Sequence, residues 1–332
     1  MAPVKILTIG DPHFKVNNVR ETDEMSAKIL ALIVELQPDA VVCLGDILDR
    51  HETIHVSPLM RATFFLQKIA EMVPLYIVIG NHDRPNNSNF LTNEHPFNAL
   101  KEWHNTVVAD CVKVAEIKGQ TFMFVPYVPP GTFRQALDTV PNVKVSAIFA
   151  HQEFYGAKMG AIVSTVGDKW DLSEPLVISG HIHDFDVLQA NVIYVGTPIQ
   201  HAFGDRCDKT VSVFTFETGF EHQRIDLKVV RRLTVTVNTT EALTYVPPNN
   251  SIVKLIISGS AEEIQTFIKL RTDRIKQLNR LGIKVVYKSV NTSLPVVNKS
   301  TQSYTQRLHE AANESQRKWL NKLFGGFTIA GN

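Results

Sequence analysis

The chain has 332 residues, of which 44% are hydrophobic and 20% charged, a composition that predicts one large globular domain with one or two smaller ones. No apolar stretch approaches the ~20 residues that span a bilayer, the N-terminus lacks a signal-peptide pattern, and three scattered cysteines indicate a reducing, cytoplasmic (intracellular) location. The net charge is +1, but residues 223–332 carry 17 Lys and Arg against 7 Asp and Glu, which fits either a polyanion-binding surface or a solvated basic face.

Five short apolar runs predict strands that are buried on both faces, because they are rich in Val and Ile and do not alternate with polar residues. Each run ends in Gly or Ala and is followed at once by a residue that can bind a metal. Because ligands gather at the carboxyl ends of strands in such sheets, these polar residues are predicted to meet at one rim. The runs are 5–10, 40–45, 75–80, 146–150 and 175–180, and the residues that follow them are Asp11, Asp46, Asn81, His151 and His181.

Helices are predicted between the early strands, at 21–37 and 56–72, so strand and helix alternate as in βαβ units. After residue 183 the pattern changes to alternating strands joined by turn residues, at 186–199, 210–218 and 222–230. The earlier segment 107–127 has the same character, with a hairpin at Gly119. These segments predict a second, more antiparallel sheet that packs on the first.

The C-terminal third is predicted to form separate units after a main domain at 1–230. In the small α/β domain at 231–290, a strand at 251–258 leads through a capping box, Ser260 to Glu263, into a helix that runs to about 281, and a strand follows at 283–290. Residues 291–332 are predicted to be a linker, 291–303, and an amphipathic helix, 304–324. That helix either docks on its own body or binds a groove in another protein, and the linker favours the second.

Each polar residue at the strand ends has a plainer explanation when it is taken alone. Asp11 and Asp49 are good helix or turn caps, Asn81 favours a left-handed turn, and His151 is a typical hydrogen-bonded core histidine. Together, however, they place carboxylate, amide and imidazole groups at five strand ends. A pair of divalent cations about 3.5–4 Å apart needs a bridging carboxylate and neutral imidazoles, and residues two apart at a strand end point the same way.

The order of the motifs resembles that of the calcineurin-like metallophosphoesterase superfamily: GDPHF (10–14), GDILDR (45–50), GNHDR (80–84), His151 and GHIH (180–183). Within it, the chain is most similar to the SbcD-type DNA repair nucleases, particularly their compact bacteriophage counterparts, through DPHF, GDILD, GTPI (196–199) and the layout of the C-terminal third. The resemblance covers about residues 1–220. It implies an α/β fold, a two-sheet αββα sandwich with a small α/β capping domain and a C-terminal helix.

The resemblance also implies a role for each matching residue. His82 would stabilise or protonate the leaving 3′-oxygen, Asp83 would fix the His82 ring, and Asp49 would orient the site from behind the ligands. Arg50, Arg84 and Tyr155 are further candidates for contact with the substrate backbone. Two divalent metal ions are expected, Mn²⁺ first and Mg, Fe or Zn as alternatives. The expected ligands are Asp11, His13 and His183 for one ion, Asn81, His151 and His181 for the other, and Asp46 as the bridge.

The function implied is a metal-dependent DNA phosphodiesterase, a 3′–5′ exonuclease and single-strand endonuclease subunit of an SbcC–SbcD-like complex. The expected partners are DNA, an SMC-type (ABC-type) ATPase bound through the helix at 304–324, and a second copy of the chain that packs through helices at 56–72 and 95–104; a membrane is not expected. Two alternatives remain open. A phosphatase or cyclic-nucleotide phosphodiesterase would use the same site but leaves the basic third unexplained, and a non-catalytic scaffold would not keep a complete set of ligands.

Overall fold

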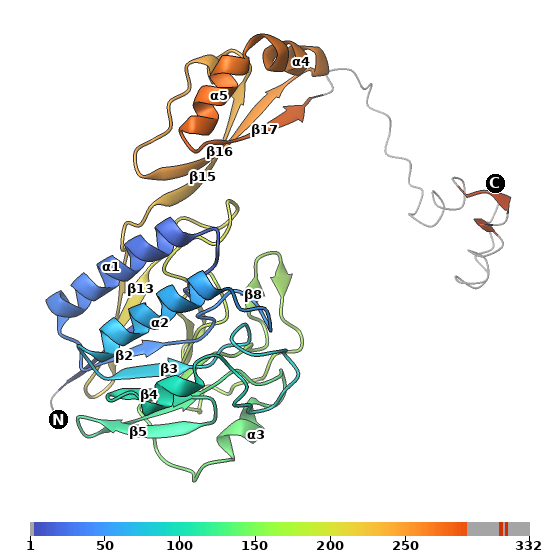
Figure 1. The fold of residues 1–332 in the computed structure, drawn as a ribbon. Helices are drawn as coiled ribbons and strands as arrows, with labels where there is room; N and C mark the ends of the chain where they lie inside the picture. The colour runs from blue at the N-terminus through green and yellow to red at the C-terminus, as the bar shows by residue number, and fades with distance from the viewer. Residues whose placement is uncertain (1–2, 291–311, 315, 318–332) are drawn as a thin grey trace.

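The computed structural model describes residues 3–290, 312–314, 316 and 317. Figure 1 shows a body of two stacked sheets, with the two longest helices on the outer face of one sheet and a smaller domain above. The predicted linker at 291–303 and nearly all of the predicted helix at 304–324 lie outside the described residues. None of the helices within the described ranges has both the length and the apolar composition to cross a membrane.

The first sheet has six strands in the order β14-β13-β1-β2-β3-β4. β1 to β4 run parallel, and β13 joins the edge of β1 in the antiparallel direction. The outer face is covered by α1 (Val19–Leu36) and α2 (Val56–Ala70), which bury Met25, Ile29 and Phe65 against it. The strands are β1 (Val4–Ile9), β2 (Ala40–Cys43), β3 (Leu75–Val78), β4 (Thr106–Ala109), β13 (Val211–Phe216) and β14 (Phe220–Ile225).

The second sheet also has six strands, in the order β11-β12-β10-β7-β6-β5. Its outer face is covered by the short helix α3 (Phe133–Leu137) and by irregular chain that contains the two-stranded hairpin β8 (Lys158–Met159) and β9 (Ile162–Val163). The strands are β5 (Lys113–Ile117), β6 (Gln120–Val125), β7 (Ala147–Ala150), β10 (Val177–Ser179), β11 (Asp186–Gln189) and β12 (Val192–Tyr194). The predicted αββα sandwich is confirmed, although its second helical layer is a single short helix.

The expected division of strands between the sheets is wrong in detail. β7 and β10 were grouped with the first three strands, but they pair in parallel within the second sheet. Conversely, β13, β14 and β4 extend the first sheet. An apolar run shows that a strand is buried on both faces, but it does not show which long-range partner the strand pairs with. The expected helix at 95–104 is a short 3-10 segment, η1 (Asn98–Glu102).

The two sheets share an apolar core that brings their strand ends to one edge. Side chains of β1, β2 and β3 pack against those of β6, β7 and β10, and Tyr76 stacks on Phe124 with ring centroids 4.3 Å apart. Burying each such aromatic ring contributes roughly 1.5–3 kcal/mol, so the face-to-face arrangement is strongly favoured. Since β1–β3 are parallel to one another and β7 is parallel to β10, the residues after these strands meet across the gap between the sheets.

The upper domain, here called the cap, is a three-stranded parallel sheet of β15 (Arg231–Asn238), β16 (Ser251–Gly259) and β17 (Lys284–Ser289). Ser260 and Glu263 form the predicted capping box. The single helix predicted after it is interrupted at Arg271, giving α4 (Ala261–Leu270) and α5 (Thr272–Arg280). β15 was not predicted, although Leu233, Val235 and Val237 alternate with polar residues as in a half-buried strand.

Candidate metal centre

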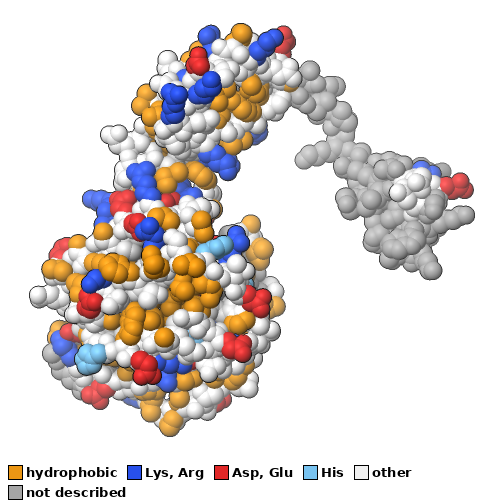
Figure 2. All heavy atoms as spheres, viewed as in Figure 1, with side chains coloured by type: hydrophobic (Ala, Val, Ile, Leu, Met, Phe, Trp, Pro, Cys, Tyr) orange, Lys and Arg blue, Asp and Glu red, His pale blue; other side chains and the backbone are white. Residues whose placement is uncertain are grey.

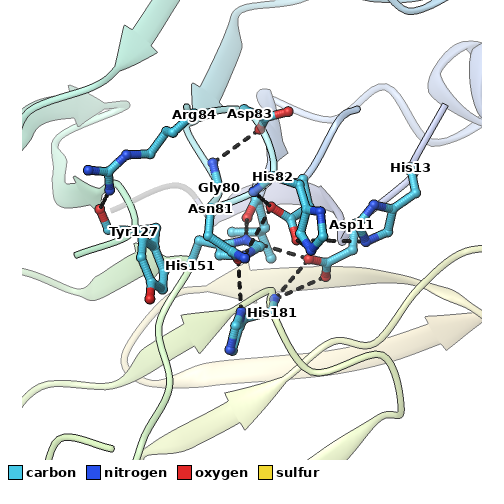
Figure 3. A network of polar contacts seen from close by, with 12 residues as sticks. Asp11, His13, Gly80, Asn81, His82, Asp83, Arg84, Tyr127, His151 and His181 are labelled. Carbon is cyan, nitrogen blue, oxygen red and sulfur yellow. Dashed lines mark hydrogen bonds and ion pairs between the residues drawn. The ribbon is translucent and has the colours of Figure 1, made fainter. Parts of the chain in front are cut away.

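The predicted ligands converge at one edge of the two stacked sheets. Figure 3 shows Asp11, His13, Asn81, His151 and His181 directed toward one another from the ends of different strands. Asp11, His13, Asp46 and Asn81 come from the first sheet, and His151, His181 and His183 from the second. The arrangement therefore depends on both sheets being correctly stacked.

Glycines allow the two sheets to approach closely at this edge. Gly45 has φ +99°, and a Cβ added there would lie 2.6 Å from Nδ1 of His151 on the other sheet. A Cβ on Gly80 would collide with the backbone and the carboxylate of Asp46. A side chain at either position would push the strand ends apart, so the glycine before each polar residue is a packing requirement of the site.

Four of the predicted ligands have an unfavourable backbone conformation. Asp11, His13, Asp46 and His181 have φ angles of +37°, +43°, +48° and +77°. Non-glycine residues in this left-handed region cost on the order of 1–3 kcal/mol each and persist only where surrounding contacts impose them. Here the backbone N–H of His181 donates to both Asp11 carboxylate oxygens, at 2.9 and 3.1 Å. Such strain clusters at functional sites, which supports a functional role for this edge.

The first half of the site is formed by Asp11, His13 and Asp46, whose ligand atoms all lie within 4.8 Å of one another. Nδ1 of His13 donates to the Leu48 carbonyl at 3.1 Å, which leaves Nε2 with a lone pair directed into the site. Nε2 of His183 lies 3.2 Å from that atom. Two imidazole nitrogens that face each other beside two carboxylates are the donor set of a divalent cation.

The second half is formed by Asp46, His151 and His181, again with ligand atoms within 4.8 Å of one another. The Leu44 carbonyl accepts from Nδ1 of His151 at 2.7 Å, so Nε2 faces the site, 3.4 Å from Oδ1 of Asp46. The Asn81 amide oxygen lies 3.0 Å from Nε2 of His151 and 3.1 Å from Nδ1 of His181. Asp46 belongs to both halves, which is the geometry that a bridging ligand needs.

Burial keeps three of the imidazoles, those of His13, His181 and His183, in the neutral form that binds a cation. It lowers the pKa of His181 to about 3, with a contribution from nearby His151. It also lowers the pKa of His13 well below the usual value and depresses that of His183. Each of these three neutral rings therefore keeps one nitrogen with a free lone pair near neutral pH.

Asp11 and His151 hold protons in the absence of a cation. Burial raises the pKa of Asp11 to about 8. Burial alone would lower the pKa of His151, but the carboxylates of Asp46 and Asp11 raise it to about 9. Burial also opposes ionisation of Asp46, yet His151 and His13 hold its pKa well below the usual range. Cations entering this site must displace protons, so their binding strengthens as pH rises.

His82 lies beside the two halves without joining either. Its backbone N–H donates to Oδ1 of Asp46 at 2.8 Å, while its ring Nε2 is 4.0 Å from Oδ2 of Asp46. The ring Nδ1 donates to the Asp49 carbonyl at 2.9 Å, and the ring stacks on His51 with centroids 4.7 Å apart. The side chain is 35% exposed, so its free Nε2 is accessible to a substrate phosphate.

Asp83 was expected to fix the His82 ring, but its carboxylate has other partners in the structure. The Asp83 carboxylate accepts from the backbone N–H groups of Leu48 and Gly80, at 3.0 and 3.1 Å, and thereby ties two ligand loops together. It is the Asp49 carbonyl that fixes the ring. Arg84 is also turned away from the site, because its buried guanidinium donates to the backbone carbonyls of Tyr127 and Asn89, as Figure 3 shows for Tyr127.

The predicted residue Asp49 lies behind the first half of the site. Its carboxylate accepts from Nζ of Lys15 at 3.0 Å, and the same oxygen is 3.8 Å from Nδ1 of His13. This places it at the back of the His13 ring, where it can orient a ligand without contacting a cation in the site.

Two residues near the ligands were not predicted as site residues. Glu153 lies on the far side of His181, with Oε2 4.0 Å from Nε2 of that ring and Oε1 bonded to the Ser164 hydroxyl. His201 packs edge-on against the rings of His13 and His183, and its Nε2 donates to the Asp11 carbonyl at 2.9 Å. The position of Glu153 two residues after His151 was the only sequence signal for it.

Comparison with known proteins agrees with this geometry. A family model described as calcineurin-like phosphoesterase matches residues 4–185. The chain therefore belongs to the calcineurin-like phosphoesterase family.

Two curated relatives are viral. "Putative phosphoesterase 244L" of Invertebrate iridescent virus 6 is 45% identical over 277 residues, covering 80% of this chain and 97% of that protein. "Putative phosphoesterase 078R" of Invertebrate iridescent virus 3 is 40% identical over 294 residues, covering 86% and 84%. Among solved structures, GAP50 of Plasmodium aligns over 69% of this chain and 86% of its own, with 13% identity and a TM-score of 0.46.

The donor set fits the two divalent cations that calcineurin-like phosphoesterases use. When bound, such a pair supplies Lewis acidity toward a phosphate oxygen and activates water as the nucleophile. The chain itself supplies a shared carboxylate, imidazoles whose tautomers are fixed by backbone carbonyls, and an accessible His82 beside the site. The chemistry that this arrangement supports is phosphoester hydrolysis.

Proposed function

We propose that the chain is a metal-dependent DNA phosphodiesterase that cleaves with 3′–5′ exonuclease and single-strand endonuclease activity and prefers Mn²⁺. The observation that carries the proposal is the basic cap placed directly above the phosphoesterase body. Residues 231–290 contain 10 Lys and Arg against 4 Asp and Glu, and Figure 2 shows basic side chains on the cap and along its junction with the body. A phosphatase acting on small molecules has no need of such a surface, whereas a nuclease requires phosphate contacts beyond the scissile bond.

A substrate panel tests the assignment. The purified chain with Mn²⁺ is expected to release nucleotides from linear DNA and to nick single-stranded DNA, and to be far slower on phosphopeptides and cyclic nucleotides. The same panel with Mg²⁺ or Zn²⁺ tests the metal preference, and DNA labelled at the 5′ or the 3′ end tests polarity. Rapid hydrolysis of phosphopeptides or cyclic nucleotides with intact DNA would assign the site to a phosphatase or cyclic-nucleotide phosphodiesterase instead.

The proposed protein partners are a second copy of the chain and an SMC-type ATPase, the latter bound through residues 304–324. Support for self-association comes from α2, where Val56, Met60 and Phe64 are 80%, 67% and 60% exposed. Residues four apart lie on one face of a helix, so these side chains form an apolar stripe. Figure 2 shows hydrophobic side chains gathered over this part of the body, and exposed apolar patches of this kind mark protein contacts.

Phe64→Glu is therefore expected to convert a dimer into a monomer, because it places a negative charge within the apolar stripe. Light scattering during size-exclusion chromatography measures the change. Val246→Glu is a matched control, since Val246 is 78% exposed on the cap, away from α2. A wild-type chain that is monomeric at tens of micromolar, or a Phe64→Glu variant that remains dimeric, would contradict a dimer through α2.

A further inference from the structure

The cap sheet has one covered face and one open face. Val235, Val253, Leu255 and Ile257 point toward the side of α4 and α5 and form the small core with Phe267. The alternate residues point the other way and are exposed or half-buried. All-parallel sheets are nearly always covered on both faces, so an open face on this sheet is unusual and suggests that a ligand covers it.

The open face is made of lysines and hydroxyl groups arranged in rows. The strand register pairs Thr234 with Lys254 and Lys254 with Lys284, so these three lie side by side across the sheet. Two residues further along, Thr236, Ile256 and Val286 form a row of which Ile256 and Val286 are apolar, and beyond them Ser258 pairs with Lys288. Four residues of strand separate Lys284 from Lys288, roughly 13 Å, so the lysines are spread along the face.

The charge on this face is of one sign. Within the part of the chain that the structure describes, Lys254, Lys284 and Lys288 form no ion pair. The four acidic residues of the cap lie elsewhere: Glu262, Glu263 and Asp273 belong to α4 and α5, and Glu241 bonds the end of β15 from η2 (Glu241–Leu243). By contrast, Lys276 on the helical side lies 3.9 Å from Asp273. Acidic residues therefore neutralise the positive charge of the sheet face less than that of the helical side.

The lower end of the open face is joined to the loop that contains His201 and Phe203. There, the Thr234 hydroxyl donates to the Phe203 carbonyl, and Ile252 packs against the core of the body. Phe203 is two residues after His201, which contacts His13 and His183. The same loop is fixed to the cap by Gln200, whose side chain pairs with both the N–H and the carbonyl of Arg232, at 2.8 and 3.2 Å.

We infer that the open face of the cap sheet is the surface that holds a DNA strand, with Lys254, Lys284 and Lys288 contacting its phosphates as the strand leaves the metal centre. This inference rests on the proposed DNA phosphodiesterase activity and specifies where the polyanion lies. Thr234 and Ser258 add hydroxyl donors for phosphate oxygens, and the Ile256 and Val286 row offers an apolar surface to sugars or bases. The more numerous basic residues on α4 and α5 face away from this path.

Two charge-matched triple variants test the inference. One carries Lys254→Gln, Lys284→Gln and Lys288→Gln on the open face, and the other carries Lys269→Gln, Lys276→Gln and Arg280→Gln on the helical side. Binding of a fluorescent thirty-nucleotide thymidine oligonucleotide is measured by anisotropy over a range of salt concentrations, with His82→Asn in each background to prevent cleavage. Thermal unfolding of each variant checks that the cap remains folded.

The open-face variant is expected to bind on the order of tenfold more weakly and to reduce the slope of log K against log salt by about 2, since each lost single-strand phosphate contact removes about 0.7. The helical-side variant is expected to change affinity less than about twofold, because charges beyond a Debye length of ~8–10 Å are screened. Equal losses in the two variants, or wild-type binding by a folded open-face variant, would overturn the inference.

Failure of this inference is distinguishable from failure of the proposed function. With His82 restored, both variants are expected to hydrolyse bis(p-nitrophenyl) phosphate like the wild-type chain, because that substrate is too small to reach the cap. A wild-type chain that hydrolyses this diester but not DNA would reject the proposed nuclease. A wild-type chain that cleaves DNA, together with an open-face variant that binds DNA normally, would reject only the assigned surface.

Discussion

Asp46→Asn is expected to lose both metal ions rather than one. Asp46 contributes to both groups of ligand atoms, with Oδ1 3.4 Å from Nε2 of His151 and Oδ2 3.7 Å from Nε2 of His13. Asparagine keeps the size of the side chain and can still accept the N–H of His82, but it removes the negative charge that two cations would share. Phosphodiester hydrolysis should fall by a factor on the order of 10³ or more.

Titration calorimetry with Mn²⁺ and elemental analysis of the purified protein measure the number of bound ions. Asp49→Asn is a suitable control, because Asp49 contacts Lys15 and lies behind His13, so this variant should keep two ions. An Asp46→Asn protein that binds two equivalents of Mn²⁺ with wild-type affinity would show that Asp46 does not bridge them.

The position of the site was predictable from sequence because its signals are local. Asp11, Asp46 and His151 each lie within three residues of the end of a buried strand, and the glycines before Asp11 and Asp46 stand where a Cβ would collide with neighbouring atoms. A strand end fixes where its next residue lies to within a few ångströms. Five such ends predict a shared rim even when the sheet to which each strand belongs is misassigned.

The features that the sequence did not predict depend on contacts between distant segments. His201 reaches the ligands from a loop 190 residues after Asp11, and only the folded chain brings its ring to His13 and His183. The contact between His82 and the Asp49 carbonyl likewise depends on how two loops pack, whereas the family resemblance implied that Asp83 fixes the ring. The interruption of the cap helix at Arg271 has no proline or glycine to mark it.

The position of the basic residues on the cap could likewise not be predicted from the sequence. Composition shows that the C-terminal third is basic, and five of its 17 Lys and Arg lie in the helical segment at 260–281. The strand register, however, places Lys254 beside Lys284 on the open face of the cap sheet. A count of charges along the chain cannot distinguish a solvated helix from a row that faces a ligand, because the difference lies in which residues are adjacent across strands.

His82→Asn is expected to abolish DNA cleavage while leaving metal and DNA binding nearly unchanged. Among the described residues the ring belongs to neither half of the metal centre, and its Nε2 is 4.0 Å from Oδ2 of Asp46. Because Nδ1 donates to the Asp49 carbonyl, Nε2 of the doubly protonated ring is the atom that can give a proton to the leaving oxygen. Asparagine is too short to reach that position, so the rate should fall by about 10²–10⁴.

A comparison of two leaving groups distinguishes proton donation by His82 from a purely structural role. A diester with a p-nitrophenolate leaving group needs little protonation, so His82→Asn should slow its hydrolysis much less than it slows DNA cleavage. His51→Phe is the matched control: it keeps a ring stacked on His82 but removes the bond to the Arg84 carbonyl, and it should retain DNA cleavage. If His82→Asn cleaves DNA at the wild-type rate, or loses a metal ion, then the ring is not the proton donor. Equal slowing of both substrates would instead place its action on the phosphate rather than on the leaving oxygen.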